Sequence, residues 1–142
     1  NAKGQFAALV DGPMNTAPGY KEVHDLIYSY VQEEIPSYGD IDLGDPRIRG
    51  SKSLNDLANK TFPNANVTIE TNVVSLEGPV TQVAETAAGF FYATFVLKPE
   101  KRKSMIASLS NILAISKEGT DAERQGRFSM PISRLLVVPE IR

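Results

Sequence analysis

The stretch from Tyr20 to Ile35 constrains the fold of this chain more than any other part of the sequence. Its apolar residues recur at steps of three and four, which places them along one face of a helix. These residues are Val23, Leu26, Ile27, Tyr30, Val31 and Ile35. Pro36 follows, and because proline disfavours helical geometry in the residue before it, we expect the helix to end there.

A second amphipathic helix is predicted from Pro99 to Ile115. Pro99 suits the first position of a helix, where its missing N–H costs nothing. The apolar stripe of this helix consists of Met105, Leu109, Ile112 and Leu113. A shorter helical turn, through Leu54, Leu57 and Ala58, is expected to begin with Ser53 as its N-cap.

The best alternating segment is Asn66–Leu76, which predicts a strand with one buried face. One face carries Val67, Ile69 and Val73, and the other carries Thr68, Glu70 and Asn72. We expect Gly78 and Pro79 to end this strand. The run Gln5–Val10 predicts a further short strand, which Asp11, Gly12 and Pro13 would end.

Two more strands are predicted in the second half of the chain. Ala88–Lys98 is aromatic and β-branched on both faces, which is typical of a strand covered on both sides. This interpretation makes Phe95 a core residue. Phe128–Ile141 reads as extended between Pro131 and Pro139, and these prolines favour an edge strand or an arm.

The order of predicted elements is therefore β-α-(short helix)-β-β-α-β. This order indicates an α+β fold, with a mostly antiparallel sheet and two main amphipathic helices packed on one face. At 142 residues the chain has the usual size of one domain and can bury a sizeable core. We expect a single domain that spans residues 1–142.

Composition excludes several classes of protein. The chain has no cysteine, which rules out disulfides and thiolate metal sites. No apolar run is long enough to cross a membrane, so no membrane partner is expected. Lys and Arg number 15 against 17 Asp and Glu, so the chain lacks the overall basic balance of a dedicated nucleic-acid binder. The charge is uneven, because residues 11–45 are acidic and residues 98–142 are mildly basic.

The sequence carries no catalytic signature, and we expect a protein that is not an enzyme. Its sole histidine, His24, is expected to be a solvated residue on the polar side of the first helix. No nucleophile elbow or phosphate-binding glycine loop accompanies it. Asp40, Asp42 and Asp45 do not match a calcium-binding loop, so they predict a plain acidic loop. Neither a metal nor a cofactor is expected.

Two basic groups remain as candidate nucleic-acid contacts, although a solvated surface is the simpler interpretation of both. The first group is Arg47, Arg49 and Lys52, and the second is Lys98, Lys101, Arg102 and Lys103. The second group falls at the beginning of the second helix, where the helix dipole favours anions rather than cations. A phosphate or an acidic partner would relieve this arrangement.

Four segments together resemble the coat proteins of the small single-stranded RNA bacteriophages, the levivirus-like phages. They are AKGQFAALVDG, NVTIETNVVSL, GFFYATFVLK and PEKRKSMIASLSNILAIS. The resemblance lies in the succession of strands and a helix. It implies a homodimer that joins two sheets, with helices over one face and genomic RNA against the other. Many dimers would close into a shell, assembled in the host cytoplasm and found in the virion.

On this interpretation the RNA-binding residues are the two basic groups, because a net charge of −2 requires local contacts. Glu70 would repel phosphates, so RNA is expected to avoid it. A ferredoxin-like βαββαβ module that binds a ligand or regulates another protein fits the same order of elements. A part of a larger extracellular or tail-type assembly and an enzyme of unrecognised type are further alternatives.

Overall fold

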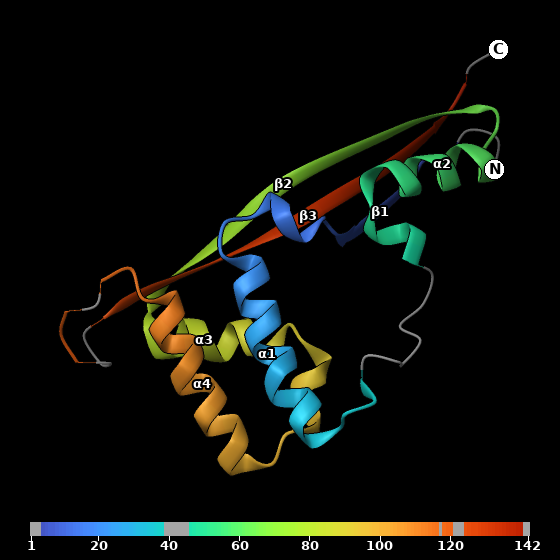
Figure 1. The fold of residues 1–142 in the computed structure, drawn as a ribbon. Coiled ribbons are helices and arrows are strands. Elements are labelled where there is room, and N and C mark those ends of the chain that lie inside the picture. Colours follow the sequence, from blue (N-terminus) through green and yellow to red (C-terminus); the bar gives the residue numbers. More distant parts are fainter. Residues whose placement is uncertain (1–3, 39–45, 117, 121–123, 141–142) are drawn as a thin grey trace. The chain divides into compact units, whose positions relative to one another are not determined.

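The computed structural model describes residues 4–38, 46–116, 118–120 and 124–140. Over these residues the chain forms four α-helices, three strands and three short 3₁₀ helices (Figure 1). The predicted α+β class with an antiparallel sheet is confirmed. In chain order the elements are β1 (Phe6–Asp11), η1 (Met14–Thr16), α1 (Tyr20–Glu34), η3 (Pro46–Arg49), α2 (Ser51–Thr61), β2 (Ala65–Pro79), α3 (Val80–Gly89), η4 (Tyr92–Val96), α4 (Pro99–Leu113) and β3 (Gln125–Pro139).

The chain divides into two compact units that alternate along the sequence. Unit 1 contains the described parts of 1–16, 43–74 and 130–142, and unit 2 contains those of 17–42 and 75–129. The boundary falls inside β2, after Val74, and inside β3, after Ser129. Each unit therefore includes part of both long strands. One domain over residues 1–142 stays a prediction.

The three strands lie in the order β1-β3-β2, so β3 is the central strand. β1 pairs antiparallel with β3, with Phe6 opposite Val137 and Asp11 opposite Ile132. The prediction of an edge strand or arm at the C-terminal end is therefore wrong. Pro131 lacks an N–H but its carbonyl still accepts a hydrogen bond of 3.0 Å from the Gly12 N–H. Pro139 is the last residue of β3, so it interrupts no further pairing.

The number and order of the strands also correct the expected succession of elements. The described residues hold three strands rather than the four of a βαββαβ domain, and two helices stand between each strand and the next. The fold expected for a ferredoxin-like module is therefore wrong.

In unit 1 the core lies between α2 and the sheet. Leu54 and Ala58 of α2 are buried with Leu135 and Val137 of β3. The partly buried residues packed around them are Ala8, Val10, Phe62, Ala65, Val67 and Ile69. The alternation predicted for β2 is confirmed in this unit up to Asn72, where half-buried and exposed residues alternate.

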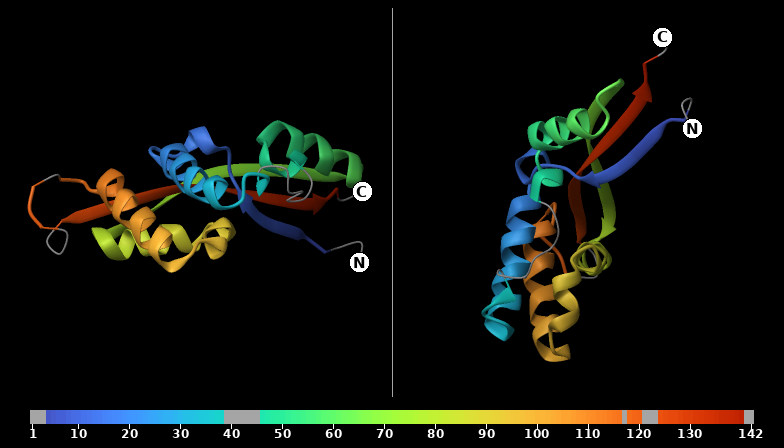
Figure 2. Two further views of the ribbon diagram at one scale, coloured as in Figure 1. Left: turned by 60° about the horizontal axis from the view of Figure 1, so that its bottom comes forward. Right: turned by 90° about the vertical axis from the view of Figure 1, so that its right-hand side faces the viewer.

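In unit 2 the core lies among three helices and η4. α1 packs against α4 and η4, and α3 packs against α4; Figure 2 shows α1 and α4 side by side. Most of the apolar residues predicted for these helices point inward, with Val23, Ile27 and Val31 buried on α1 and Met105, Leu109 and Leu113 buried on α4. Ile112, which was placed in the same stripe, is 48% exposed, so that part of the prediction is wrong. Alanines 84, 87 and 88 of α3 are fully buried, and their small side chains let α4 approach closely.

The strand predicted at Ala88–Lys98 is wrong, because this segment is helical. It contains the end of α3 and the whole of η4. Phe91, Thr94 and Leu97 are buried at steps of three, which is the period of a 3₁₀ helix, and Ala93 is buried next to Thr94. Burial of the adjacent residues 93 and 94 does not fit the alternation of a strand with one buried face. Phe95 lies on the opposite side and is 77% exposed, so it is not a core residue.

Two other boundaries differ from the prediction. Gly78 and Pro79 are the last residues of β2, and Pro79 caps α3, a helix that the sequence analysis missed. α2 begins at Ser51, with Gly50 as its N-cap. Ser53 is therefore not the cap; its hydroxyl donates to backbone carbonyls instead.

Candidate functional site

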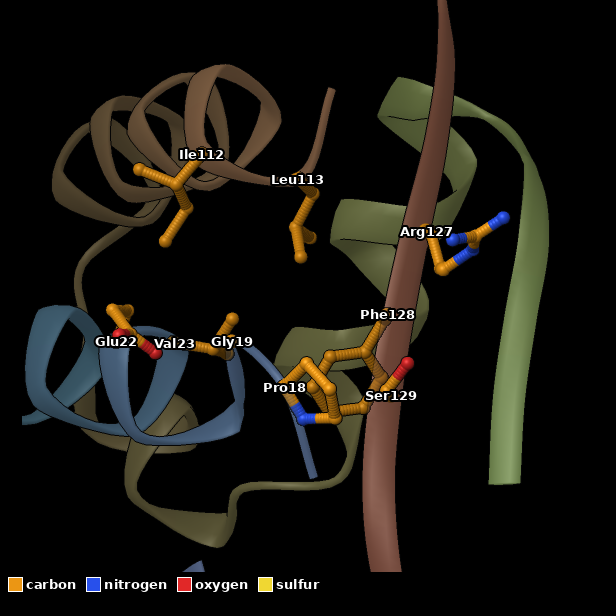
Figure 3. A pocket seen from close by; sticks show the side chains of 9 residues that line it. All are labelled: Pro18, Gly19, Glu22, Val23, Ile112, Leu113, Arg127, Phe128 and Ser129. Carbon is orange, nitrogen blue, oxygen red and sulfur yellow. The ribbon is translucent and has the colours of Figure 1, made fainter. Parts of the chain in front are cut away.

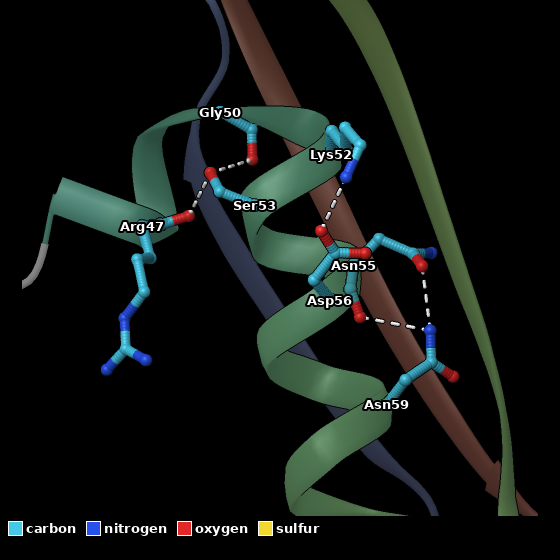
Figure 4. A network of polar contacts seen from close by, with 7 residues as sticks. All are labelled: Arg47, Gly50, Lys52, Ser53, Asn55, Asp56 and Asn59. Carbon is cyan, nitrogen blue, oxygen red and sulfur yellow. Dashed lines mark hydrogen bonds and ion pairs between the residues drawn. The ribbon is translucent and has the colours of Figure 1, made fainter.

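The first basic group lies in unit 1, on η3 and the first turn of α2 (Figure 4). The Ser53 hydroxyl donates to the carbonyls of Arg47, at 2.7 Å, and Gly50, at 3.1 Å, and so fixes the corner between the two helices. Lys52 Nζ lies 2.8 Å from Asp56 Oδ2, and this hydrogen bond raises the pKa of Lys52. Both side chains of this pair are largely exposed, so the pair is weak and a phosphate can compete with Asp56.

The second basic group lies in unit 2, and two of its members are already neutralised. Lys101 Nζ lies 2.6 Å from Glu33 Oε2 on α1, and 3.8 Å from Glu34 Oε1. Arg102 Nη1 lies 2.8 Å from Glu85 Oε2 on α3. The sequence led us to expect an acidic partner beside the N-terminus of α4. The carboxylates of Glu33, Glu34 and Glu85 in the same chain fill that role.

The other two members of the second group remain available. Lys98 is the N-cap of α4, and Lys103 lies within that helix; both are exposed. Within the described part of the chain neither lysine forms an ion pair. Lys98 and Lys103 are therefore the members of this group best able to contact an external anion.

Glu70, the residue expected to repel RNA, is paired in unit 1. Its carboxylate accepts a hydrogen bond of 2.7 Å from Arg134 on the neighbouring strand β3. A comparable pair in unit 2 joins Glu77 of β2 to Arg127 of β3 at 2.6 Å. The arginines of the central strand thus offset the carboxylates of β2, a match that depends on strand register and was not foreseen.

His24 is held by its neighbours on α1. Its Nδ1 lies 3.1 Å from Asp25 Oδ1, and its ring stacks on Tyr28 with centroids 4.3 Å apart. Asp25 also accepts a hydrogen bond from Lys21, and this bond, followed by that of His24, lowers the pKa of Asp25. The His24 side chain is 27% exposed, so it is in contact with solvent, as expected, and is partly covered by these neighbours.

Replacing His24 with alanine is expected to leave assembly and nucleic-acid binding unchanged. The histidine contacts a carboxylate and aromatic rings, and the loss of its stacking on Tyr28 should cost about 0.5–1.5 kcal/mol. Chemical denaturation measures that cost, and size-exclusion chromatography measures assembly. A variant that folds fully but loses its biological activity would contradict the non-enzymatic interpretation.

Unit 2 contains a shallow cavity of about 430 Å³ (Figure 3). It is lined by Pro18, Gly19, Glu22, Val23, Ile112, Leu113, Arg127, Phe128 and Ser129. Figure 3 shows Arg127 directed away from this cavity, toward β2, where it binds Glu77. Among the described lining residues, Glu22 is then the one charged side chain directed at the cavity. A single carboxylate provides no pair of groups for acid–base chemistry.

Unit 1 contains a second shallow cavity, of about 490 Å³, whose described lining residues carry no charge. Its aromatic residues, Phe6 and Phe62, stack on each other with ring centroids 5.9 Å apart. Ligand sites usually combine an apolar cavity with a few converging polar groups. Neither cavity among the described residues has that combination.

No metal site or membrane span is found in the described ranges. They contain no group of three acidic or histidine residues placed to hold an ion. Asp40, Asp42 and Asp45, the acidic loop of the sequence analysis, lie outside these ranges. None of the described helices has the length and apolar character that crossing a membrane requires.

The surface carries large apolar side chains, among them Val73 and Phe95, which the sequence analysis placed on buried faces. On β2, Val73 and Val74 are 44% and 49% exposed. On η4, Tyr92 is 84% exposed and Phe95 is 77% exposed. Because the two residues of each pair lie close together, each pair is a candidate contact surface.

Comparison with known proteins identifies no family for this chain. No protein-family model matches it, and no curated protein matches it. The exposed apolar surfaces, the two basic groups and the resemblance of four segments to phage coat proteins are therefore the observations that bear on function.

Proposed function

We propose that this chain is a coat protein, a structural subunit that dimerises and assembles with further copies into a virion shell around single-stranded RNA. The observation that carries this proposal is the outer edge of β2. β2 is 15 residues long and lies at the edge of the sheet, so its outward backbone groups have no strand beside them among the described residues. Such an edge is a template for pairing with another chain.

The side chains at this edge reinforce the argument. Val73 and Val74 are consecutive in a strand, so they point to opposite faces of the sheet. Both are about half exposed, which leaves apolar surface in water on the two faces. Addition of a strand from a second copy would pair the backbone of β2 and cover both side chains. Interfaces of this kind are large and apolar, so we expect the dimer to persist until the subunits unfold.

The charges are compatible with RNA inside such a shell. Arg47, Arg49 and Lys52 supply positive charge in unit 1, and Lys98 and Lys103 supply it in unit 2. Glu70 is neutralised by Arg134, which reduces the repulsion of phosphates expected at that position. A shell subunit also needs no catalytic group, in keeping with cavities that lack converging polar side chains.

The assembly is tested by replacing Val74 with lysine. The wild-type protein is expected to form dimers and closed particles that contain nucleic acid. In Val74→Lys, a lysine would have to be desolvated in the interface, so association should weaken by at least about tenfold. Size-exclusion chromatography with light scattering gives the mass, electron microscopy shows the particles, and the ultraviolet absorbance ratio reports nucleic acid.

Gln32→Lys is the matched control, because Gln32 is an exposed polar residue of α1, outside the sheet. This variant should assemble like the wild type, and both variants should keep the wild-type circular-dichroism spectrum in the absence of denaturant. A wild-type protein that stays monomeric at high concentration without bound nucleic acid would rule out the coat function. Assembly of Val74→Lys at wild-type strength would rule out the β2 edge as the interface.

A further inference from the structure

Tyr92 and Phe95 form an exposed aromatic pair on η4. Side chains three residues apart lie above one another in a 3₁₀ helix, so the two rings share the outer face of this element. Their centroids are 6.4 Å apart and their planes are inclined by 39°. With 84% and 77% of these residues exposed, both rings are open to another molecule.

The inner face of η4 holds the aromatic pair in place. The Thr94 hydroxyl donates to the carbonyls of Ala88, at 3.1 Å, and Phe91, at 2.9 Å. Phe91 is buried, and its ring lies 5.9 Å from that of Tyr20 on α1. Leu97 is also buried at the end of the element. The backbone that carries the aromatic pair is therefore held in place. Little backbone conformational entropy is lost when a ligand covers the two rings.

Positive charge follows the pair directly in the chain. Lys98 comes three residues after Phe95, and Lys103 lies on the α4 helix that begins at Pro99. Both lysines are exposed and without an ion pair among the described residues, whereas Glu100, also exposed, is the carboxylate between them. The surface thus offers flat rings together with two cations, the combination that binds bases and phosphates of a single strand.

We propose that single-stranded RNA crosses η4 with unpaired bases stacked on Tyr92 and Phe95, while Lys98 and Lys103 contact its phosphates. This inference rests on the proposed function, which supplies RNA as the ligand, and it adds base stacking to the basic groups considered above. A duplex does not fit this site, because its bases already stack on one another.

The area of the pair favours RNA over a protein partner. A Phe or Tyr side chain buries roughly 150–250 Å², so the two exposed rings offer roughly 300 Å². A stable protein interface needs about 800 Å² on each partner. The pair is too small to form the greater part of such an interface, but two bases of a strand need no more than two ring faces.

A tryptophan reporter tests the stacking directly. The chain has no tryptophan, so Phe95→Trp creates a single indole at the site. Titration with a short single-stranded oligouridine is expected to quench its fluorescence, and duplex RNA of equal length is expected to quench it much less. Quenching by the duplex at the same concentrations would overturn the inference. Quenching by anionic phospholipid vesicles but not by oligouridine would overturn it as well, in favour of a membrane surface.

Alanine variants test the contribution of each ring. Tyr92→Ala and Phe95→Ala should each lower the affinity for the oligonucleotide by about tenfold, and Tyr92→Phe should retain it because the ring remains. Leu9→Ala, at a 71% exposed apolar residue of β1, is the control and should bind normally. Replacing both Lys98 and Lys103 with alanine should reduce the slope of log K against log salt by about 1.4, because each lost phosphate contact contributes about 0.7.

These measurements separate the inference from the proposed function. Oligonucleotide binding is measured in the Val74→Lys background, at protein concentrations where light scattering detects no particles. If the wild type forms RNA-filled particles but Tyr92→Ala and Phe95→Ala bind RNA normally, the coat function stands and the stacking site is refuted. If the alanine variants instead lose dimerisation while keeping RNA affinity, the pair is a protein contact and the inference is also refuted.

Discussion

Replacement of Phe128 by alanine is expected to lower the free energy of unfolding by about 3–5 kcal/mol. Phe128 is only 2% exposed and is among the largest fully buried side chains of the described residues. Its ring lies 6.0 Å from that of Tyr20 and 6.1 Å from that of Phe90, so truncation leaves a cavity between aromatic neighbours. Urea denaturation followed by circular dichroism measures the loss.

Phe95→Ala is the matched control for this experiment. The same chemical change at a 77% exposed residue should alter stability by no more than about 0.5 kcal/mol. The strand predicted from the sequence required the opposite, with Phe95 in the core. Equal losses for Phe95→Ala and Phe128→Ala would contradict the outward orientation of Phe95 on η4.

Gly126→Ala is expected to destabilise the protein by about 1–3 kcal/mol. A Cβ at this position would lie 2.9 Å from Val80 Cγ2 and 3.0 Å from Val80 Cα. The second of these is a backbone atom, which cannot rotate away as the end of a flexible side chain can. The Val80 N–H also donates to the Arg124 carbonyl at 3.0 Å, so the start of α3 is held against the start of β3.

Gly89→Ala provides the comparison. Gly89 is the last residue of α3, its φ is not positive, and no heavy atom lies within 4 Å of a Cβ built there. Alanine should therefore stabilise the protein by about 0.5–1 kcal/mol through its higher helix propensity. Thermal melts of the two variants should shift in opposite directions. A wild-type melting temperature for Gly126→Ala would disprove the close approach of Val80 to β3.

The helices with wide apolar stripes could be predicted from the sequence. α1 and α4 agree with their predicted bounds to within two residues, because a long periodic pattern, Pro36 and Pro99 all point to the same helices. α3 was missed although its apolar residues also recur at helical steps. It follows directly on a strand that ends in Gly78 and Pro79, and these residues were read as the start of a loop.

The segment around η4 shows where propensity fails. Aromatic and β-branched residues favour strands only because they fit a half-buried pleated surface. Here Phe91 and Leu97 fit between helices instead, and Thr94 bonds to local carbonyls. Apolar residues three positions apart were present in the sequence. Over so few residues, however, the period of three of a 3₁₀ helix cannot be distinguished from the period of two of a strand unless the packing partners are known.

The sequence predicted which basic residues make up the candidate site, but not which of them are already paired with carboxylates. All seven basic residues could be named, yet the pairing of Lys101 with Glu33 and of Arg102 with Glu85 joins helices distant in the sequence. Such contacts depend on tertiary packing. The exposure of Tyr92 could not be predicted for the same reason, since the wrong secondary structure implied a strand covered on both faces.

The position of β3 in the sheet has a consequence for the order of events during protein synthesis. β1 and β2 both bond to β3, which is the last of the three strands to leave the ribosome. Until then neither earlier strand has its partner, whereas the helices α1, α3 and α4, which pack on one another, all precede β3. A growing chain therefore displays Val73 and Val74 on an unpaired strand, and it is most prone to aggregate at this stage. Association of copies in the native register has to wait until β3 has been made.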